Sequence, residues 1–75
     1  MVDKLIQIAL YKKGSKKNLG VFLGFPEKYA TQRVNKIIEN QNFKMEILKK
    51  LLTAAEVEAY MDMAITAEHD KIFAK

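Results

Sequence analysis

Amide, hydroxyl and basic side chains recur between residues 28 and 36 with the spacing of one side of a helix. An amide such as Gln32 or Asn35 makes paired hydrogen bonds with adenine, whereas a lysine suits guanine or phosphate. Thr31 suits a thymine methyl group or a phosphate. The candidate base-reading residues are therefore Lys28, Thr31, Gln32, Asn35 and Lys36. The simpler interpretation is that these side chains face solvent, as they would on any amphipathic helix.

A second group of basic side chains has the charge needed to hold a nucleic-acid backbone. Contacts with phosphates set the position of a protein on DNA and supply most of its affinity. The candidate backbone contacts are Lys12, Lys13, Lys16, Lys17 and Arg33. The alternative is that these residues form only a solvated, charged surface.

Residues that support catalysis or metal binding are scarce. The chain has no cysteine and one histidine, His69, whose acidic neighbours in the sequence are Asp62, Glu68 and Asp70. A single histidine among acids on an exposed helix is ordinarily a surface residue, and no nucleophile–base pair or glycine-rich phosphate loop is present. We therefore expect no catalytic residues, no metal, no cofactor and no enzymatic activity.

Length and charge narrow the class of protein further. The 75 residues suffice for one domain and carry a net charge of +4. Residues 1–50 hold eleven basic and four acidic side chains, whereas residues 51–75 hold two basic and five acidic ones. This asymmetry suggests a basic face for a polyanion and a separate acidic element. Without cysteines, a signal peptide or an apolar run of about 20 residues, we expect a cytoplasmic protein with no membrane partner.

Helical spacing of apolar residues recurs along the whole chain, and strand signals are weak. Ser15 is a good N-cap, and Gly14 and Gly24 are suited to ending helices with a positive φ. Gly20 lies inside a helix, which indicates that another helix passes very close to it. The expected helices cover residues 3–13, 15–23, 26–39, 44–52 and 54–73.

Two local signals set boundaries in this scheme. Pro26 suits the first position of the third helix, and Thr53 with Glu56 has the spacing of a capping box. The sequence thus predicts a compact, all-α, five-helix domain. Residues 1–53 would form the DNA-binding part, and residues 54–75 would form a C-terminal helix that completes the core or mediates dimerisation.

The stretch Leu19-Gly20-Val21-Phe22-Leu23-Gly24-Phe25 has the spacing of a helix-turn-helix motif. It resembles the Leu-Ala-x-x-Leu-Gly-Val signature of the lambda-repressor-like family, which includes the Cro and cI repressors. The run Val34-Asn35-Lys36-Ile37-Ile38 is similar to the end of that family's recognition helix, with Val34 and Ile37 buried. The resemblance covers about residues 3–55 and implies that the third helix enters the major groove of DNA.

The sequence departs from the family pattern by about four extra residues between Phe25 and Val34. Four residues amount to about one helical turn. The insertion therefore either lengthens the turn or extends the start of the recognition helix. In the second case Ala30 also becomes a candidate for the buried face.

The C-terminal helix carries more apolar surface than a four-helix core requires. We expect it to dock partly on the core and partly on a second copy, through Tyr60, Met61, Ile65, Ile72 and Phe73. A homodimer would place two recognition helices about 34 Å apart on a roughly palindromic site.

These observations predict a small, sequence-specific DNA-binding transcriptional regulator of phage or mobile-element type that acts by occupying an operator on double-stranded DNA. The alternative is a protein-binding module on the same scaffold, such as an antirepressor, an inhibitor or an antitoxin-like protein. The four-residue insertion, the acidic tail and the outward acids Glu27 and Glu39 favour this alternative.

Overall fold

Helices account for most of the computed structural model, which describes residues 2–40, 43–58 and 60–74. Within these ranges there are five α-helices and no strand, so the all-α, five-helix prediction is confirmed. The elements are α1 (Val2–Lys13), α2 (Lys16–Phe22), the 3₁₀ turn η1 (Glu27–Tyr29), α3 (Ala30–Asn40), α4 (Met45–Ala55) and α5 (Asp62–Phe73).

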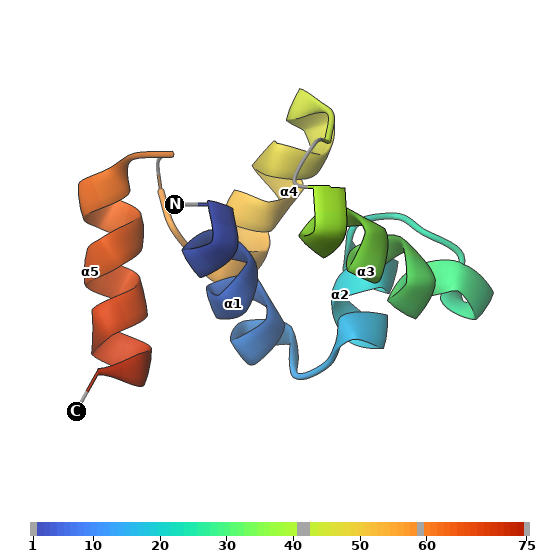
Figure 1. The fold of residues 1–75 in the computed structure, drawn as a ribbon, viewed down its shortest axis with the longest axis horizontal. Helices are drawn as coiled ribbons and strands as arrows, with labels where there is room; N and C mark the ends of the chain where they lie inside the picture. Colours follow the sequence, from blue (N-terminus) through green and yellow to red (C-terminus); the bar gives the residue numbers. More distant parts are fainter. Residues whose placement is uncertain (1, 41–42, 59, 75) are drawn as a thin grey trace.

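Helix α1 is the centre of the fold, with α5 on one side and α2, α3 and α4 on the other (Figure 1). Its buried residues include Leu5 and Ile8, neither of which is exposed to solvent. Apolar residues from α2, α3, α4 and α5 complete one core. The largest fully buried side chains are Leu5, Ile8, Leu19, Leu23, Val34, Leu51 and Ile65.

Local sequence signals explain the corner between α1 and α2. Gly14 has a φ of +92°, which favours glycine, and its N–H donates to the carbonyl of Leu10 to close α1. The hydroxyl of Ser15 accepts a hydrogen bond from the N–H of Asn18 at 3.1 Å. Both the helix end at Gly14 and the N-cap at Ser15 are therefore confirmed.

The third helix begins later than the sequence predicts. Pro26 precedes η1, and the α-helix itself begins at Ala30, whose side chain is completely buried. Because η1 lies between α2 and α3, the residues after Phe25 lengthen the connection between these two helices. They do not add a turn to α3, which begins at the buried Ala30. The connection is longer than the three or four residues of an ordinary helix-turn-helix.

The predicted helix break at Thr53 is wrong. The hydroxyl of Thr53 donates to the carbonyl of Lys49 at 3.1 Å, one turn earlier, and therefore lies inside α4. The helix continues because Ala54 and Ala55 extend its buried stripe. It ends at Glu56, which adopts the left-handed conformation with φ of 58°, and the last helix begins at Asp62 and not at residue 54.

No helix in the described ranges has the length and apolar character needed to span a bilayer. The polar run Asn40-Gln41-Asn42 predicts the end of the third helix, and its residues 41 and 42 lie outside the described residues.

Candidate nucleic-acid interface

The pair α2–α3 carries most of the candidate contact residues, and its packing depends on a glycine. A Cβ atom added to Gly20 would lie 2.6 Å from both the Cβ and the carbonyl oxygen of Ala30. The two helices can approach this closely only because position 20 has no side chain. The close approach predicted for Gly20 is thus confirmed, and its partner is the first residue of α3.

The turn between these helices depends on a second glycine. Gly24 has a φ of +98°, as predicted, and the N–H of Phe25 donates to the carbonyl of Gly20 at 3.0 Å. The Lys50 ammonium of α4 donates to the carbonyl of Leu23 at 3.1 Å and holds the turn against the rest of the fold. These contacts fix the path of the chain from α2 towards α3.

Helix α3 has one buried side and one exposed side. Ala30, Val34 and Ile37 are buried, which agrees with the inward positions expected for Val34 and Ile37. Most of the candidate base-reading residues face outward: Lys28 on η1 and Thr31, Gln32 and Lys36 on α3 are exposed, and Asn35 is half-buried. Arg33, expected to contact the backbone, is also exposed on α3.

A shallow depression of about 330 Å³ runs along the exposed side of α3. It is lined by Tyr29, Gln32, Arg33 and Lys36. Tyr29 is 45% exposed, with the Lys28 ammonium 5.7 Å from its ring centre. The sequence leaves Tyr29 open between a DNA contact and a partly buried residue and favours burial. Tyr29 precedes Gln32, Arg33 and Lys36 by three, four and seven residues, however, which is the spacing of one helix face.

Two lysines at the start of α2 contact polar groups of η1 and α3. The Lys16 ammonium donates to Asn35 Oδ1 at 2.7 Å, and Lys17 forms an ion pair with Glu27 at 2.8 Å. The hydrogen bond from Lys17 lowers the pKa of the Glu27 carboxyl below its ordinary value. A phosphate near Lys17 would therefore compete with the Glu27 carboxylate for its ammonium group.

The other two lysine candidates lie at the end of α1. The Lys13 ammonium is 4.0 Å from the ring centre of Phe22, the last residue of α2. Lys12 instead forms ion pairs with Glu68 of α5 at 3.3 Å and with Glu56 at 3.6 Å. The hydrogen bond with Glu68 is the main reason that the pKa of Lys12 is raised. The Lys12 ammonium thus contacts α5 and the end of α4, and its role as a contact with the DNA backbone stays a prediction.

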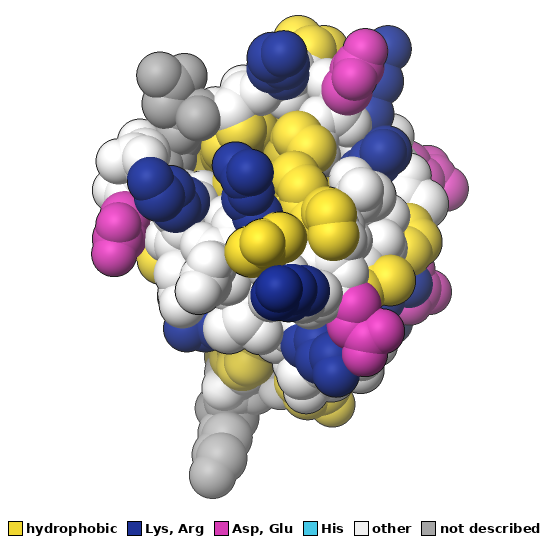
Figure 2. Space-filling view, turned by 90° about the vertical axis from the view of Figure 1, so that its right-hand side faces the viewer, with side chains coloured by type: hydrophobic (Ala, Val, Ile, Leu, Met, Phe, Trp, Pro, Cys, Tyr) yellow, Lys and Arg dark blue, Asp and Glu magenta, His cyan; other side chains and the backbone are white. Residues whose placement is uncertain are grey.

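Figure 2 views the molecule from the side on which α2 and α3 lie in Figure 1. Hydrophobic side chains gather near the centre of this face, and Lys and Arg side chains lie among and around them. Asp and Glu side chains lie at the edges and also on the lower right of the face, beside basic side chains. Exposed apolar residues of α2 and η1 include Val21, Phe22 and Tyr29. The acidic helix α5 lies on the opposite side of α1 and does not cover this face (Figure 1).

The residues expected at a dimer interface fall into two groups. Ile65 is completely buried, so its place in that set is corrected: it belongs to the core of one chain. Tyr60, Met61 and Phe73 keep exposed surface, and Ile72 is half-buried. The Phe73 ring also packs against Tyr11 of α1.

His69 takes part in the docking of α5. Its Nε2 lies 2.7 Å from Gln7 Oε1 of α1, and its ring packs against Phe73 with 4.6 Å between the ring centres. Within the described residues, no group of three or more His, Asp or Glu side chains could hold a metal ion.

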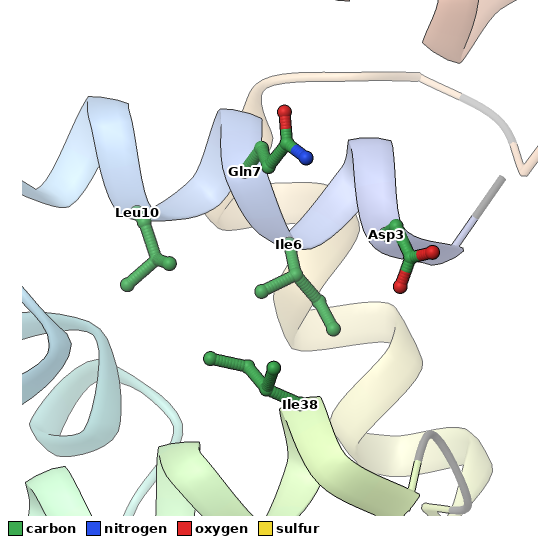
Figure 3. A pocket seen from close by; sticks show the side chains of 5 residues that line it. All are labelled: Asp3, Ile6, Gln7, Leu10 and Ile38. Atoms are coloured by element: carbon green, nitrogen blue, oxygen red, sulfur yellow. The ribbon is translucent and has the colours of Figure 1, made fainter.

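A second hollow, of about 210 Å³, lies between α1 and α3. Ile6 and Ile38 point towards each other across it, and Leu10 lies beside them (Figure 3). Asp3 and Gln7 form its polar edge on α1. The hollow is on the inner side of α3, away from the exposed stripe that carries the candidate reading residues.

Comparisons with protein-family models, curated proteins and solved structures found no match to this chain.

Proposed function

We propose that this chain is a small, sequence-specific DNA-binding regulator that occupies an operator on double-stranded DNA in the cytoplasm. The observation that carries the proposal is the exposed side of α3. It presents Gln32, Arg33 and Lys36 along one depression, while the opposite side of the helix packs on α2. Residues 28–38 contain no acidic side chain, so nothing on this stretch repels phosphate. Amide and guanidinium groups on an outward helix are suited to base edges in the major groove.

The charge distribution supports the same orientation on DNA. Basic side chains surround the α2–α3 face, and the acidic helix α5 lies behind α1 (Figures 1 and 2). A duplex is therefore attracted to the α3 side and repelled from the α5 side. Each phosphate neutralised by a lysine or arginine adds about 0.9 to the slope of log affinity against log salt.

A titration of labelled duplex DNA, followed by fluorescence anisotropy at several salt concentrations, tests the proposal. With about four phosphate contacts, we expect the affinity to fall roughly 100-fold between 50 and 200 mM salt. Charge reversal by Arg33→Glu should abolish binding, whereas Lys71→Glu on α5 is the matched control and should change it little. Absence of duplex binding at low salt, or binding insensitive to both salt and Arg33→Glu, contradicts the proposal.

We include a homodimer in this proposal, formed on the α5 side of the molecule. Tyr60, Met61 and Phe73 leave apolar surface exposed there, beyond what the core of one chain covers. Sedimentation analysis should give twice the mass of one chain, and Met61→Lys should shift the equilibrium towards monomer. A monomer at all concentrations, with and without DNA, contradicts this part of the proposal.

The second candidate function is binding of a protein partner through the same face. The apolar side chains at the centre of the basic face favour it, because duplex DNA presents little apolar surface to cover Val21 or Phe22. Substitution of Phe22 by Ser distinguishes the two functions. It should leave duplex affinity unchanged if DNA is the ligand, and it should eliminate binding of the partner if the ligand is a protein.

A further inference from the structure

The hydrogen bond between Lys16 and Asn35 joins the first residue of α2 to the middle of α3. The distance between Lys16 Nζ and Asn35 Oδ1 is 2.7 Å. An ammonium group only donates hydrogen bonds, so the carbonyl oxygen of the amide must be the atom facing Lys16. The orientation of the Asn35 side chain is therefore determined by its chemistry.

This orientation changes what Asn35 offers to a ligand. A paired contact with adenine needs the amide oxygen to accept from N6 and the amide nitrogen to donate to N7. In this structure Lys16 donates to one of the two lone pairs of this oxygen and places a positive charge beside it. The pair therefore offers mainly donors, namely the amide NH₂ and the remaining ammonium hydrogens. A cluster of donors with a net positive charge matches a phosphate oxygen and not the mixed edge of adenine.

Beside this pair, Arg33 and Gln32 share the depression on the exposed side of α3. Within the described residues no carboxylate forms an ion pair with Arg33, and no side chain forms a hydrogen bond with Gln32. The guanidinium fork is thus available to the O6 and N7 acceptors of guanine, the commonest specific contact in the major groove. The free amide of Gln32 retains both the donor and the acceptor that adenine requires.

We propose that Lys16 and Asn35 act together as a phosphate clamp, and that sequence is read next to it by Arg33, which selects guanine, and by Gln32. This inference rests on the proposed function and exchanges the roles that the sequence suggests for Asn35 and Arg33. The clamp fixes how α3 lies along the backbone, and the adjacent pair then meets the base edges. The preferred duplex therefore contains a guanine at the position that Arg33 contacts.

The test begins with a duplex selected from a random pool by the full-length protein and a scrambled duplex of the same composition. Affinities are measured at three salt concentrations for the wild type and for Lys16→Ala, Asn35→Ala, their double variant, Arg33→Lys and Gln32→Ala. Lys71→Ala on α5 serves as the control, and circular dichroism confirms that each variant is folded.

The two groups of variants should behave differently. Lys16→Ala and Asn35→Ala should weaken both duplexes by the same factor, and the double variant should be little weaker than Lys16→Ala. Lys16→Ala should also lower the salt slope by about 0.9. Arg33→Lys keeps the charge but loses the paired N–H donors of the guanidinium group. It should therefore retain affinity for the scrambled duplex, and its preference for guanine should fall roughly 5- to 150-fold.

Three outcomes overturn the inference while leaving the proposed function intact. They are a base preference that disappears with Asn35→Ala, a guanine preference retained by Arg33→Lys, and a selected duplex in which no guanine position matters. Failure of the wild-type protein to bind any duplex at low salt is a different result, because it refutes the proposed function itself.

Discussion

Replacing Gly20 by alanine tests the packing that positions the whole candidate interface. The added Cβ would lie 2.6 Å from the Cβ and the carbonyl oxygen of Ala30 and 2.8 Å from its carbonyl carbon. Ordinary van der Waals contact begins at about 3.4 Å, so α2 and α3 must separate by roughly 0.8 Å. Two of the three obstructing atoms belong to the backbone, which cannot rotate away as a flexible side chain would.

Two opposing terms determine the size of the effect. Alanine is more favourable than glycine inside a helix by about 0.8–1 kcal/mol. Forcing extra volume into a packed contact costs about 1–3 kcal/mol. We expect the steric term to exceed the gain in propensity, so Gly20→Ala should reduce the free energy of unfolding by about 1 kcal/mol. For a domain of this length, that corresponds to a fall of about 4–8 °C in Tm.

Thermal and urea unfolding followed by circular dichroism at 222 nm measure this change. Val21→Ala is the matched control, because it lies next to Gly20 in the same helix, is 47% exposed and is not among the residues that a Cβ at position 20 would meet. The control should change Tm by only a few degrees. A rise in Tm for Gly20→Ala would show that helix propensity outweighs the contact, and the close approach of α2 and α3 would then be refuted.

Three further substitutions test other parts of the structure. Ile65→Ala should reduce the free energy of unfolding by about 2–5 kcal/mol, because the side chain is fully buried, and a loss below about 1 kcal/mol in urea unfolding would mean that α5 is not docked. Ser15→Ala removes the oxygen that caps the N–H of Asn18 and should cost about 1 kcal/mol in the same assay, whereas an unchanged midpoint would show that the cap contributes nothing. Glu27→Gln frees Lys17 from its ion pair and should strengthen duplex binding and steepen the salt slope by about 0.9; an unaltered slope would remove Lys17 from the interface.

Short-range signals in the sequence predict many features of the fold correctly. Gly14, Ser15 and Gly24 act within a few residues of the backbone, through allowed φ values and a hydroxyl at hydrogen-bonding distance. The prediction at Thr53 is wrong because its local signal fits two different structures. The same hydroxyl can cap a following helix or bond to the preceding turn, and the choice depends on whether the adjacent Ala54 and Ala55 become buried in the core.

Some features of the candidate interface were predictable from the sequence, and others were not. The residue types on α3 and their periodicity are visible in the chain, so the exposure of Gln32 and Lys36 was predictable. The partners of the lysines were not predictable, because residues 16 and 35 or 12 and 68 meet only when the helices pack. The sequence therefore assigns Lys12 and Lys16 the same role, contact with the DNA backbone. In the structure Lys12 contacts Glu68 of α5, whereas Lys16 contacts Asn35 of α3.

The amino-acid sequence alone determines an all-α chain, its helix-ending glycines and a basic N-terminal part opposed to an acidic tail, because these properties depend on local conformation and composition. The tertiary structure decides where α3 begins, which lysines remain near its exposed side, and that the amide oxygen of Asn35 accepts a hydrogen bond from Lys16. Those outcomes depend on contacts between residues far apart in the chain, above all the approach of Gly20 to Ala30, and on the space that each side chain leaves for its neighbours.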